Sequence, residues 1–159
     1  MDFRIGFGYD VHRLAEGYNL MLGGIKIPHN KGSVGHSDAD VLIHVICDAL
    51  LGAANMRDIG YHFPDSDPRY KDIDSKKLLK EVIKRIKGKG YSIGNIDTTV
   101  CLQNPKIQSY IPEMITSLAG VMDIDEENIS IKATTTEKMG FIGKEEGLEA
   151  YAVALIYKS

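Results

Sequence analysis

A short strand-like segment, Gly8-Tyr9-Asp10-Val11-His12, constrains the fold of this chain more than any other feature. Asp10 and His12 alternate with glycine or apolar residues. In an extended strand both side chains therefore point to the same face. The segment predicts a strand that presents a carboxylate and an imidazole side by side.

A second motif, residues 35–44, leads from a Gly-His-Ser-Asp turn into a helix. Apolar residues recur at helical spacing from Val41 onward, which predicts a helix over residues 38–53. His44 falls within its first two turns. Two neutral imidazoles and one carboxylate, from Asp10, His12 and His44, are a typical ligand set for zinc. Three protein ligands leave a fourth position open for a water or a substrate oxygen, as catalytic zinc sites require.

His44 has other interpretations. It is a core histidine if it pairs with Asp40 or Asp48, which lie four residues away on the same helix face. In the metal interpretation, one of these carboxylates orients the imidazole instead. A third interpretation is that Cys47 completes a closed structural zinc site.

His36 and Ser37 immediately precede the predicted helix. The first amides of a helix lack intrahelical partners and attract anions. A histidine and a hydroxyl at this place predict a phosphate-binding turn. The structural alternative is that Ser37 or Asp38 simply caps the helix.

Residues 55–73 mix Gly, Pro and Asp without periodicity and predict a long loop, which in a compact domain is more often functional than idle. Asp58, Gly60 and Asp65 are candidates for binding substrate hydroxyls. Turn chemistry is the alternative for all of them. It is the better account of Asp67 and the proline after it.

Residues 133–138 end a predicted strand with three threonine hydroxyls, a carboxylate and an ammonium group. This pattern predicts a phosphate cradle in which Glu137 holds a hard divalent cation such as Mg²⁺. The structural alternative is a β-favouring threonine run followed by a Thr-Glu helix start. Lys106 ends another predicted strand and offers a point charge there.

The order of elements predicts an α+β fold, a mixed β-sheet covered by helices, in a single domain spanning residues 1–159. The predicted strands cover residues 3–11, a hairpin at 19–28, and residues 93–102, 129–133 and 148–157; the predicted helices cover residues 38–53, 75–89 and a shorter segment after Pro112. The lysines of the second helix are interpreted as a solvated face.

Composition narrows the function classes. The formal net charge of −3 argues against a general nucleic-acid-binding surface. No apolar run reaches membrane-span length, and the first four residues lack a signal-peptide layout, so no membrane partner is expected. The two cysteines, Cys47 and Cys101, form no disulfide framework or CxxC pattern, and the predicted location is the cytoplasm.

Over essentially its whole length the chain closely resembles the 2-C-methyl-D-erythritol 2,4-cyclodiphosphate synthase family of the non-mevalonate isoprenoid pathway. The resemblance rests on separate motifs in the family's order: Gly8–His12, Gly35–Asp40 with His44, Asp48–Ala54, Asp58–Gly60, Phe63–Asp65, Pro105-Lys106, Ile111-Pro112 and Lys132–Phe141.

The resemblance implies a homotrimer with active sites between adjacent subunits. It also implies the substrate, 4-diphosphocytidyl-2-C-methyl-D-erythritol 2-phosphate, whose 2-phosphate attacks its own β-phosphorus and releases CMP. Phosphoryl transfer of this kind depends mainly on positioning and charge neutralisation, which explains why the chain has no persuasive nucleophile–base pair.

The resemblance implies a role for each matching residue. Asp10, His12 and His44 bind Zn²⁺, and Glu137 binds a second divalent cation, Mg²⁺ or Mn²⁺. The catalytic residues are His36, Thr135 and Glu137. The implied substrate-binding residues are Ser37, Asp58, Gly60, Asp65, Pro105, Lys106, Ala133, Thr134, Phe141 and Lys144. By the same resemblance, the family's cytidine nucleotide pocket is matched by Pro105, Lys106, Ala133, Thr134 and Thr135. Lys144 stands where many relatives carry arginine, and Tyr151 where some carry glutamate.

Two rival functions are a zinc-dependent phosphoester hydrolase and a non-catalytic trimer. The hydrolase would use metal-bound hydroxide as its nucleophile. The trimer would hold structural zinc and bind nucleotides or isoprenoid diphosphates without turnover.

Overall fold

A computed structural model describes residues 2–159. Five strands form one sheet in the order β4-β1-β7-β5-β6. Their bounds are β1 Phe3–Glu16, β4 Lys31–Val34, β5 Tyr91–Cys101, β6 Ile129–Thr134 and β7 Gly147–Lys158. The β5–β6 pair is parallel and the other three pairs are antiparallel. The predicted mixed sheet is therefore confirmed.

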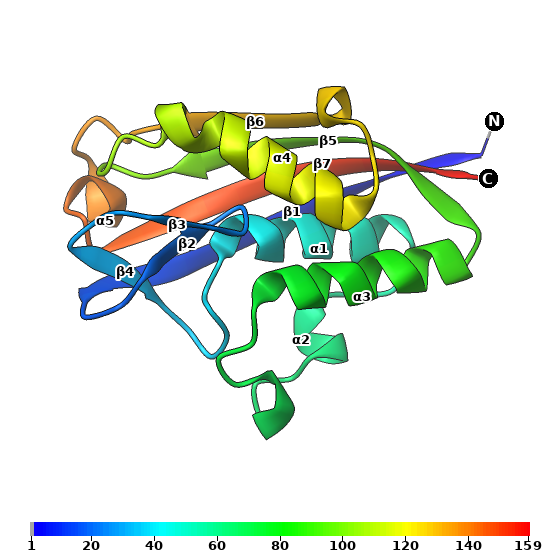
Figure 1. The fold of residues 1–159 in the computed structure, drawn as a ribbon, viewed down its shortest axis with the longest axis horizontal. Coiled ribbons are helices and arrows are strands. Elements are labelled where there is room, and N and C mark those ends of the chain that lie inside the picture. The colour runs from blue at the N-terminus through cyan, green and yellow to red at the C-terminus, as the bar shows by residue number, and fades with distance from the viewer. Residues whose placement is uncertain (1) are drawn as a thin grey trace.

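The main helices lie together on one face of this sheet (Figure 1). The helices are α1 Val41–Ala53, α2 Ile59–His62, α3 Ser75–Gly88, α4 Ile111–Met122 and α5 Gly140–Gly143. Helix α1 packs between β1 and β7 on one side and α3 on the other. All residues of α1 except Asp48 and Gly52 are buried, so the helix is mostly apolar, whereas α3 buries one apolar stripe and exposes its lysines. These layers confirm the α+β class.

A tight hairpin forms around two glycines, as predicted. Strand β2, Leu20–Leu22, pairs with β3, Ile25–Ile27, across Gly23 and Gly24, which both have positive φ. The amides of these two glycines donate to the buried carboxylate of Asp40, at 3.0 and 2.7 Å. The hairpin is thereby attached to the start of α1.

The opposite face of the sheet is apolar and exposed. Helix α1 packs against the face to which Gly8 points, so the odd-numbered residues of β1 point away from the helices. Phe3, Ile5 and Phe7 are each more than half exposed there, and Val153 and Tyr157 of β7 are also exposed. One large apolar surface of the chain is thus left uncovered.

Three local predictions differ from the structure. Strand β1 continues to Glu16, because its second half pairs with β4. The segment 55–73 is not all loop, since it holds α2 and a 3₁₀ turn at Pro68–Tyr70. Helix α1 begins at Val41 and not at residue 38, because neither Ser37 nor Asp38 caps it; the cap is Asp40, whose carboxylate accepts from the Ile43 amide at 3.0 Å.

None of the helices within residues 2–159 has the length and apolarity needed to span a bilayer.

Candidate metal centre and substrate pockets

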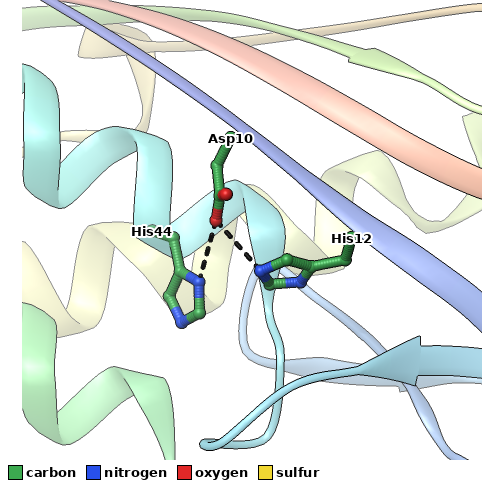
Figure 2. A group of neighbouring side chains, drawn as sticks. All are labelled: Asp10, His12 and His44. Carbon is green, nitrogen blue, oxygen red and sulfur yellow. Dashed lines mark hydrogen bonds and ion pairs between the residues drawn. The ribbon is translucent and has the colours of Figure 1, made fainter. Parts of the chain in front are cut away.

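Asp10, His12 and His44 converge on one point, as predicted (Figure 2). The Asp10 Oδ2 atom lies 3.0 Å from His12 Nε2 and 3.1 Å from His44 Nδ1. One ligand atom from each of the three residues falls within 4.8 Å of the others. The two imidazole rings meet edge-on, with centroids 5.1 Å apart. Two nitrogens and one carboxylate oxygen arranged in this way fit a zinc ion.

Two elements position these side chains. Asp10 and His12 lie two residues apart on β1 and face α1, which carries His44. The helix approaches the strand closely because Gly8 has no side chain, and a Cβ there would overlap the Val45 carbonyl group. A glycine in the strand thus sets the separation between the two halves of the triad.

The imidazole nitrogens that face away from the triad are also bonded. The Nδ1 atom of His12 lies 2.9 Å from the Ala39 carbonyl oxygen, so Nδ1 carries the proton and Nε2 offers a lone pair. The Nε2 atom of His44 faces the hydroxyls of Ser37 at 3.2 Å and Ser75 at 3.1 Å. Partners of this kind orient histidines that bind metals.

Asp10 and His12 of the triad shift each other's pKa values. Burial alone would raise the pKa of Asp10, but the hydrogen bonds and charges of the two histidines hold it well below its usual range. Burial alone would lower the pKa of His12, but its contact with Asp10 raises it. Asp10 therefore stays ionised and presents an anionic oxygen to a cation.

The alternative interpretations of His44, as the partner of Asp40 or Asp48 or as part of a closed site with Cys47, are wrong. Asp40 bonds to backbone amides of the hairpin and of α1, and Asp48 accepts from the Ile59 amide at 2.8 Å. His44 is not a core histidine paired with either carboxylate, because it faces Asp10 instead. Cys47 is fully buried outside the triad, and burial raises the pKa of its thiol, which disfavours the thiolate that zinc needs.

The triad lines a pocket of about 330 Å³. His36, Ser37, Gly60 and Asp65 line the same pocket, so four further predicted site residues are gathered around the candidate metal centre. The buried Nε2 atom of His36 has no hydrogen-bond partner within residues 2–159, which leaves it available to a ligand.

The backbone amides that were expected to be free before α1 are partly occupied. The Ala39 amide donates to Ser37 Oγ and the Asp40 amide to Asp38 Oδ1, both at 3.2 Å. Anion binding at this turn therefore depends on the side chains of His36 and Ser37 more than on the amides.

Asp58 and Asp67 have structural roles. Asp58 caps α2 and accepts from the Tyr61 amide at 2.9 Å, and it does not line the pocket, although its neighbour Ile59 does. Asp67 caps the 3₁₀ turn through the Arg69 amide, as turn chemistry predicts.

A second pocket, also about 330 Å³, brings together the five residues predicted to bind a nucleotide. They are Pro105, Lys106, Ala133, Thr134 and Thr135. Strands β5 and β6 are parallel and pair as far as Cys101 and Thr134, so the segments that follow them emerge at the same edge of the sheet. At this edge, the same pocket is lined by Lys106, which carries an ammonium group, and by Thr134 and Thr135, which carry hydroxyls.

Glu137, Phe141 and Lys144 are exposed and line neither pocket. The structural alternative for Glu137 is wrong, because no helix starts at Thr136. Glu137 and Lys138 both have positive φ, and α5 begins only at Gly140.

A model of the YgbB family matches residues 3–157 of the chain. The chain belongs to the YgbB family.

Known proteins resemble this chain over nearly its whole length. A 2-C-methyl-D-erythritol 2,4-cyclodiphosphate synthase of Bacteroides thetaiotaomicron is 63% identical over 158 residues, which cover 99% of both chains. Among solved structures, IspF of Plasmodium falciparum in a CDP complex has a TM-score of 0.87 at 38% identity and covers 99% of this chain and 97% of its own. The bifunctional IspDF of Campylobacter jejuni has a TM-score of 0.96 at 39% identity, with 99% of this chain and 43% of its own chain covered.

The sequence did not predict the roles of three residues at the candidate metal centre, Gly8, Ser75 and Asp38. Gly8 was noticed only as a neighbour of Asp10, although a small residue facing a helix is a signal for close packing. Asp38 is interpreted from sequence only as a possible helix cap, and Ser75 is not singled out at all. Ser75 contacts both His44 and Asp38, although 37 positions separate it from Asp38 in the chain. No local pattern reports a contact of that kind.

Proposed function

We propose that residues 1–159 form one cyclodiphosphate synthase domain, which converts 4-diphosphocytidyl-2-C-methyl-D-erythritol 2-phosphate to 2-C-methyl-D-erythritol 2,4-cyclodiphosphate and CMP. The observation that carries this proposal is the Asp10, His12 and His44 triad at the wall of a pocket. It lies in a chain that is 63% identical to a relative named for this product.

The triad would hold Zn²⁺, because two imidazole nitrogens and a carboxylate oxygen match the donors of catalytic zinc sites. A bound zinc supplies positive charge that polarises and positions a phosphate oxygen.

Glu137 would hold a second divalent cation, Mg²⁺ or Mn²⁺, since its carboxylate is exposed and carboxylate oxygens suit these hard ions. Glu137→Gln should weaken the dependence of turnover on added Mg²⁺, and an unchanged Mg²⁺ titration would remove Glu137 from this role.

The two pockets would hold the two ends of the substrate. Gly60 and Asp65 line the pocket and suit the hydroxyls of the erythritol part, and the carboxylate of Asp58, which lies next to Gly60, would assist them. The pocket around Lys106 and Thr135 suits the cytidine nucleotide, and the P. falciparum relative was solved as a CDP complex. Phe141 and Lys144 complete the proposed set of substrate-binding residues.

The nucleophile belongs to the substrate. Its 2-phosphate oxygen forms a bond to the β-phosphorus while the bond from that phosphorus to the CMP oxygen breaks. The chain must hold these groups in line and neutralise their charge. The Nε2 atom of His36, which has no hydrogen-bond partner within residues 2–159, and the hydroxyl of Ser37 would face one part of this charge. Thr135 and Lys106, which line the other pocket, would face the other part.

The chain would act as a homotrimer with active sites between subunits. Two observations support this assembly. The apolar face formed by Phe3, Ile5, Phe7 and their neighbours is uncovered in one chain, and a contiguous apolar surface of this kind marks an interaction site. The two pockets have no lining residue in common, as expected if each active site combines one pocket from each of two subunits. Sedimentation velocity should give three times the chain mass of 17.6 kDa.

The proposed compartment is the cytoplasm. It rests on Cys47 and Cys101, which are both buried as free thiols and suit a reducing environment.

Phosphorus NMR of the purified protein with the diphosphocytidyl substrate, zinc and Mg²⁺ tests the proposed reaction. Formation of a cyclic diphosphate together with CMP is the expected result. An opened phosphoester would support the hydrolase, and unchanged substrate would support a non-catalytic trimer. The names of the relatives favour neither rival.

A further inference from the structure

A buried hydroxyl lies directly behind one of the triad histidines. Ser75, the first residue of α3, is fully buried, and its Oγ atom lies 3.1 Å from Nε2 of His44. The same hydroxyl donates a hydrogen bond to Oδ1 of Asp38. The Ser75 amide donates to Oδ2 of Asp38 at 3.0 Å. Asp38, Ser75 and His44 therefore form a continuous chain of hydrogen bonds that ends at the candidate metal centre.

The hydrogen bonds in this chain run in one direction. A serine hydroxyl has one proton to donate, and the Asp38 carboxylate is an acceptor. Since Ser75 donates to Asp38, its oxygen must act as an acceptor toward His44. Nε2 of His44 then carries the ring proton, and Nδ1 is left with a lone pair directed to the point where Asp10 and His12 meet.

We infer that Ser75, held by Asp38, is a positioning residue that fixes His44 in the tautomer and orientation needed to bind the metal. The tautomer of His12 is fixed instead by the backbone carbonyl group of Ala39, and no side-chain substitution removes that group. The support behind His44 consists of side chains and can be tested by substitution.

Ser37 differs from Ser75 in its surroundings. Its Oγ atom also lies 3.2 Å from His44 Nε2, but it lines the pocket, is partly exposed and accepts the Ala39 amide. With Ser75 holding the imidazole, the Ser37 hydroxyl proton remains available to an anionic ligand in the pocket. Ser75 thus supports the metal ligand His44, and Ser37 is placed to contact the substrate.

This inference rests on the proposed metal site, so its test measures zinc binding and not turnover. The dissociation constant for zinc is measured by competition with a chromophoric chelator, in the wild type and in Ser75→Ala, Asp38→Asn and Ser37→Ala. Ser33→Ala is the matched control, because Ser33 is also a buried serine but its hydroxyl has no hydrogen-bond partner within residues 2–159. Circular dichroism of each metal-free variant reports whether it is folded.

We expect Ser75→Ala to bind zinc about 10- to 100-fold more weakly than the wild type, the usual effect of losing a partner behind a metal-binding histidine. Asp38→Asn should weaken binding in the same direction, and it decides the matter if Ser75→Ala does not fold. Ser33→Ala should bind as the wild type does, and Ser37→Ala should lose less than Ser75→Ala.

A folded Ser75→Ala protein with wild-type zinc affinity would overturn the inference and leave the proposed metal site intact. A larger loss in Ser37→Ala than in Ser75→Ala would also overturn it, because Ser37 would then be the support. A wild-type protein that does not bind zinc would overturn the proposed metal site itself.

Discussion

The backbone carbonyl group of Val45 packs directly against Gly8. A Cβ atom on Gly8 would lie 2.9 Å from the carbonyl carbon and closer still to the oxygen. Val45 is adjacent to His44 in α1, and Gly8 is two residues from Asp10 in β1. This contact therefore sets the distance between the strand ligands and the helix ligand of the candidate metal centre.

Gly8→Ala should damage both the fold and the metal site. The added methyl group meets backbone atoms, which cannot rotate away, so we expect a loss of about 1–3 kcal/mol in the free energy of unfolding. Zinc affinity should fall as well, because α1 must move away from β1. Denaturant unfolding and zinc competition measure the two effects. Gly52→Ala is the control, since its Cβ would meet nothing within 4 Å, and this variant should be at least as stable as the wild type.

His44→Ala should abolish turnover and lose zinc while leaving a folded oligomer. The fold is expected to survive because the residues around His44 in α1 are buried aliphatic side chains that need no metal. Activity, zinc content and circular dichroism of the same sample measure this. His29→Ala, which alters a histidine outside the pocket, should retain both zinc and activity. An unfolded His44→Ala protein would point to a structural metal.

Zinc affinity should depend on pH through His12. A histidine binds zinc only as the neutral imidazole. Burial lowers the pKa of His12, but the bond to Asp10 outweighs this and raises the pKa above the ordinary value of 6.5. In the metal-free protein a proton therefore competes with zinc up to a pH above 6.5. Affinity should rise with pH through this window and level off above the pKa of His12. Zinc competition at a series of pH values measures it, and a constant affinity between about pH 6 and about pH 8 would contradict the prediction.

Lys106→Ala should weaken binding of CDP. The Lys106 ammonium lines the pocket proposed for the cytidine nucleotide, and a hydrogen bond to a charged group contributes about 1.5–3 kcal/mol. Because this lysine is exposed, we expect a loss at the lower end, about tenfold in the dissociation constant. Isothermal titration calorimetry measures it. Lys80→Ala, on the outer face of α3, should bind CDP as the wild type does; an equal loss in both variants would indicate unspecific charge attraction.

The triad could be predicted from sequence because each part follows from a local period. Alternation in β1 places Asp10 and His12 on one face, and helical spacing places His44 in the first turns of α1. Tertiary contacts decided the features that were mispredicted or missed. Asp40 caps α1 in place of Ser37 or Asp38 because the same carboxylate binds the hairpin amides. Ser75 reaches His44 only because α3 packs on α1.

The strand order of the sheet is a further feature that local sequence does not contain. The two nucleotide-pocket segments come together because β5 and β6 are parallel neighbours, and this depends on how α4 crosses between them. The role of Glu137 stays a prediction, since its exposed carboxylate makes no contact that identifies a ligand.

Anomalous diffraction at the zinc absorption edge, from crystals grown with zinc, tests the central claim most directly. We predict one strong peak about 2.0–2.2 Å from Asp10 Oδ2, His12 Nε2 and His44 Nδ1, with a fourth position open to solvent or ligand. A peak coordinated by Cys47, or no peak at the triad under these conditions, would contradict the account.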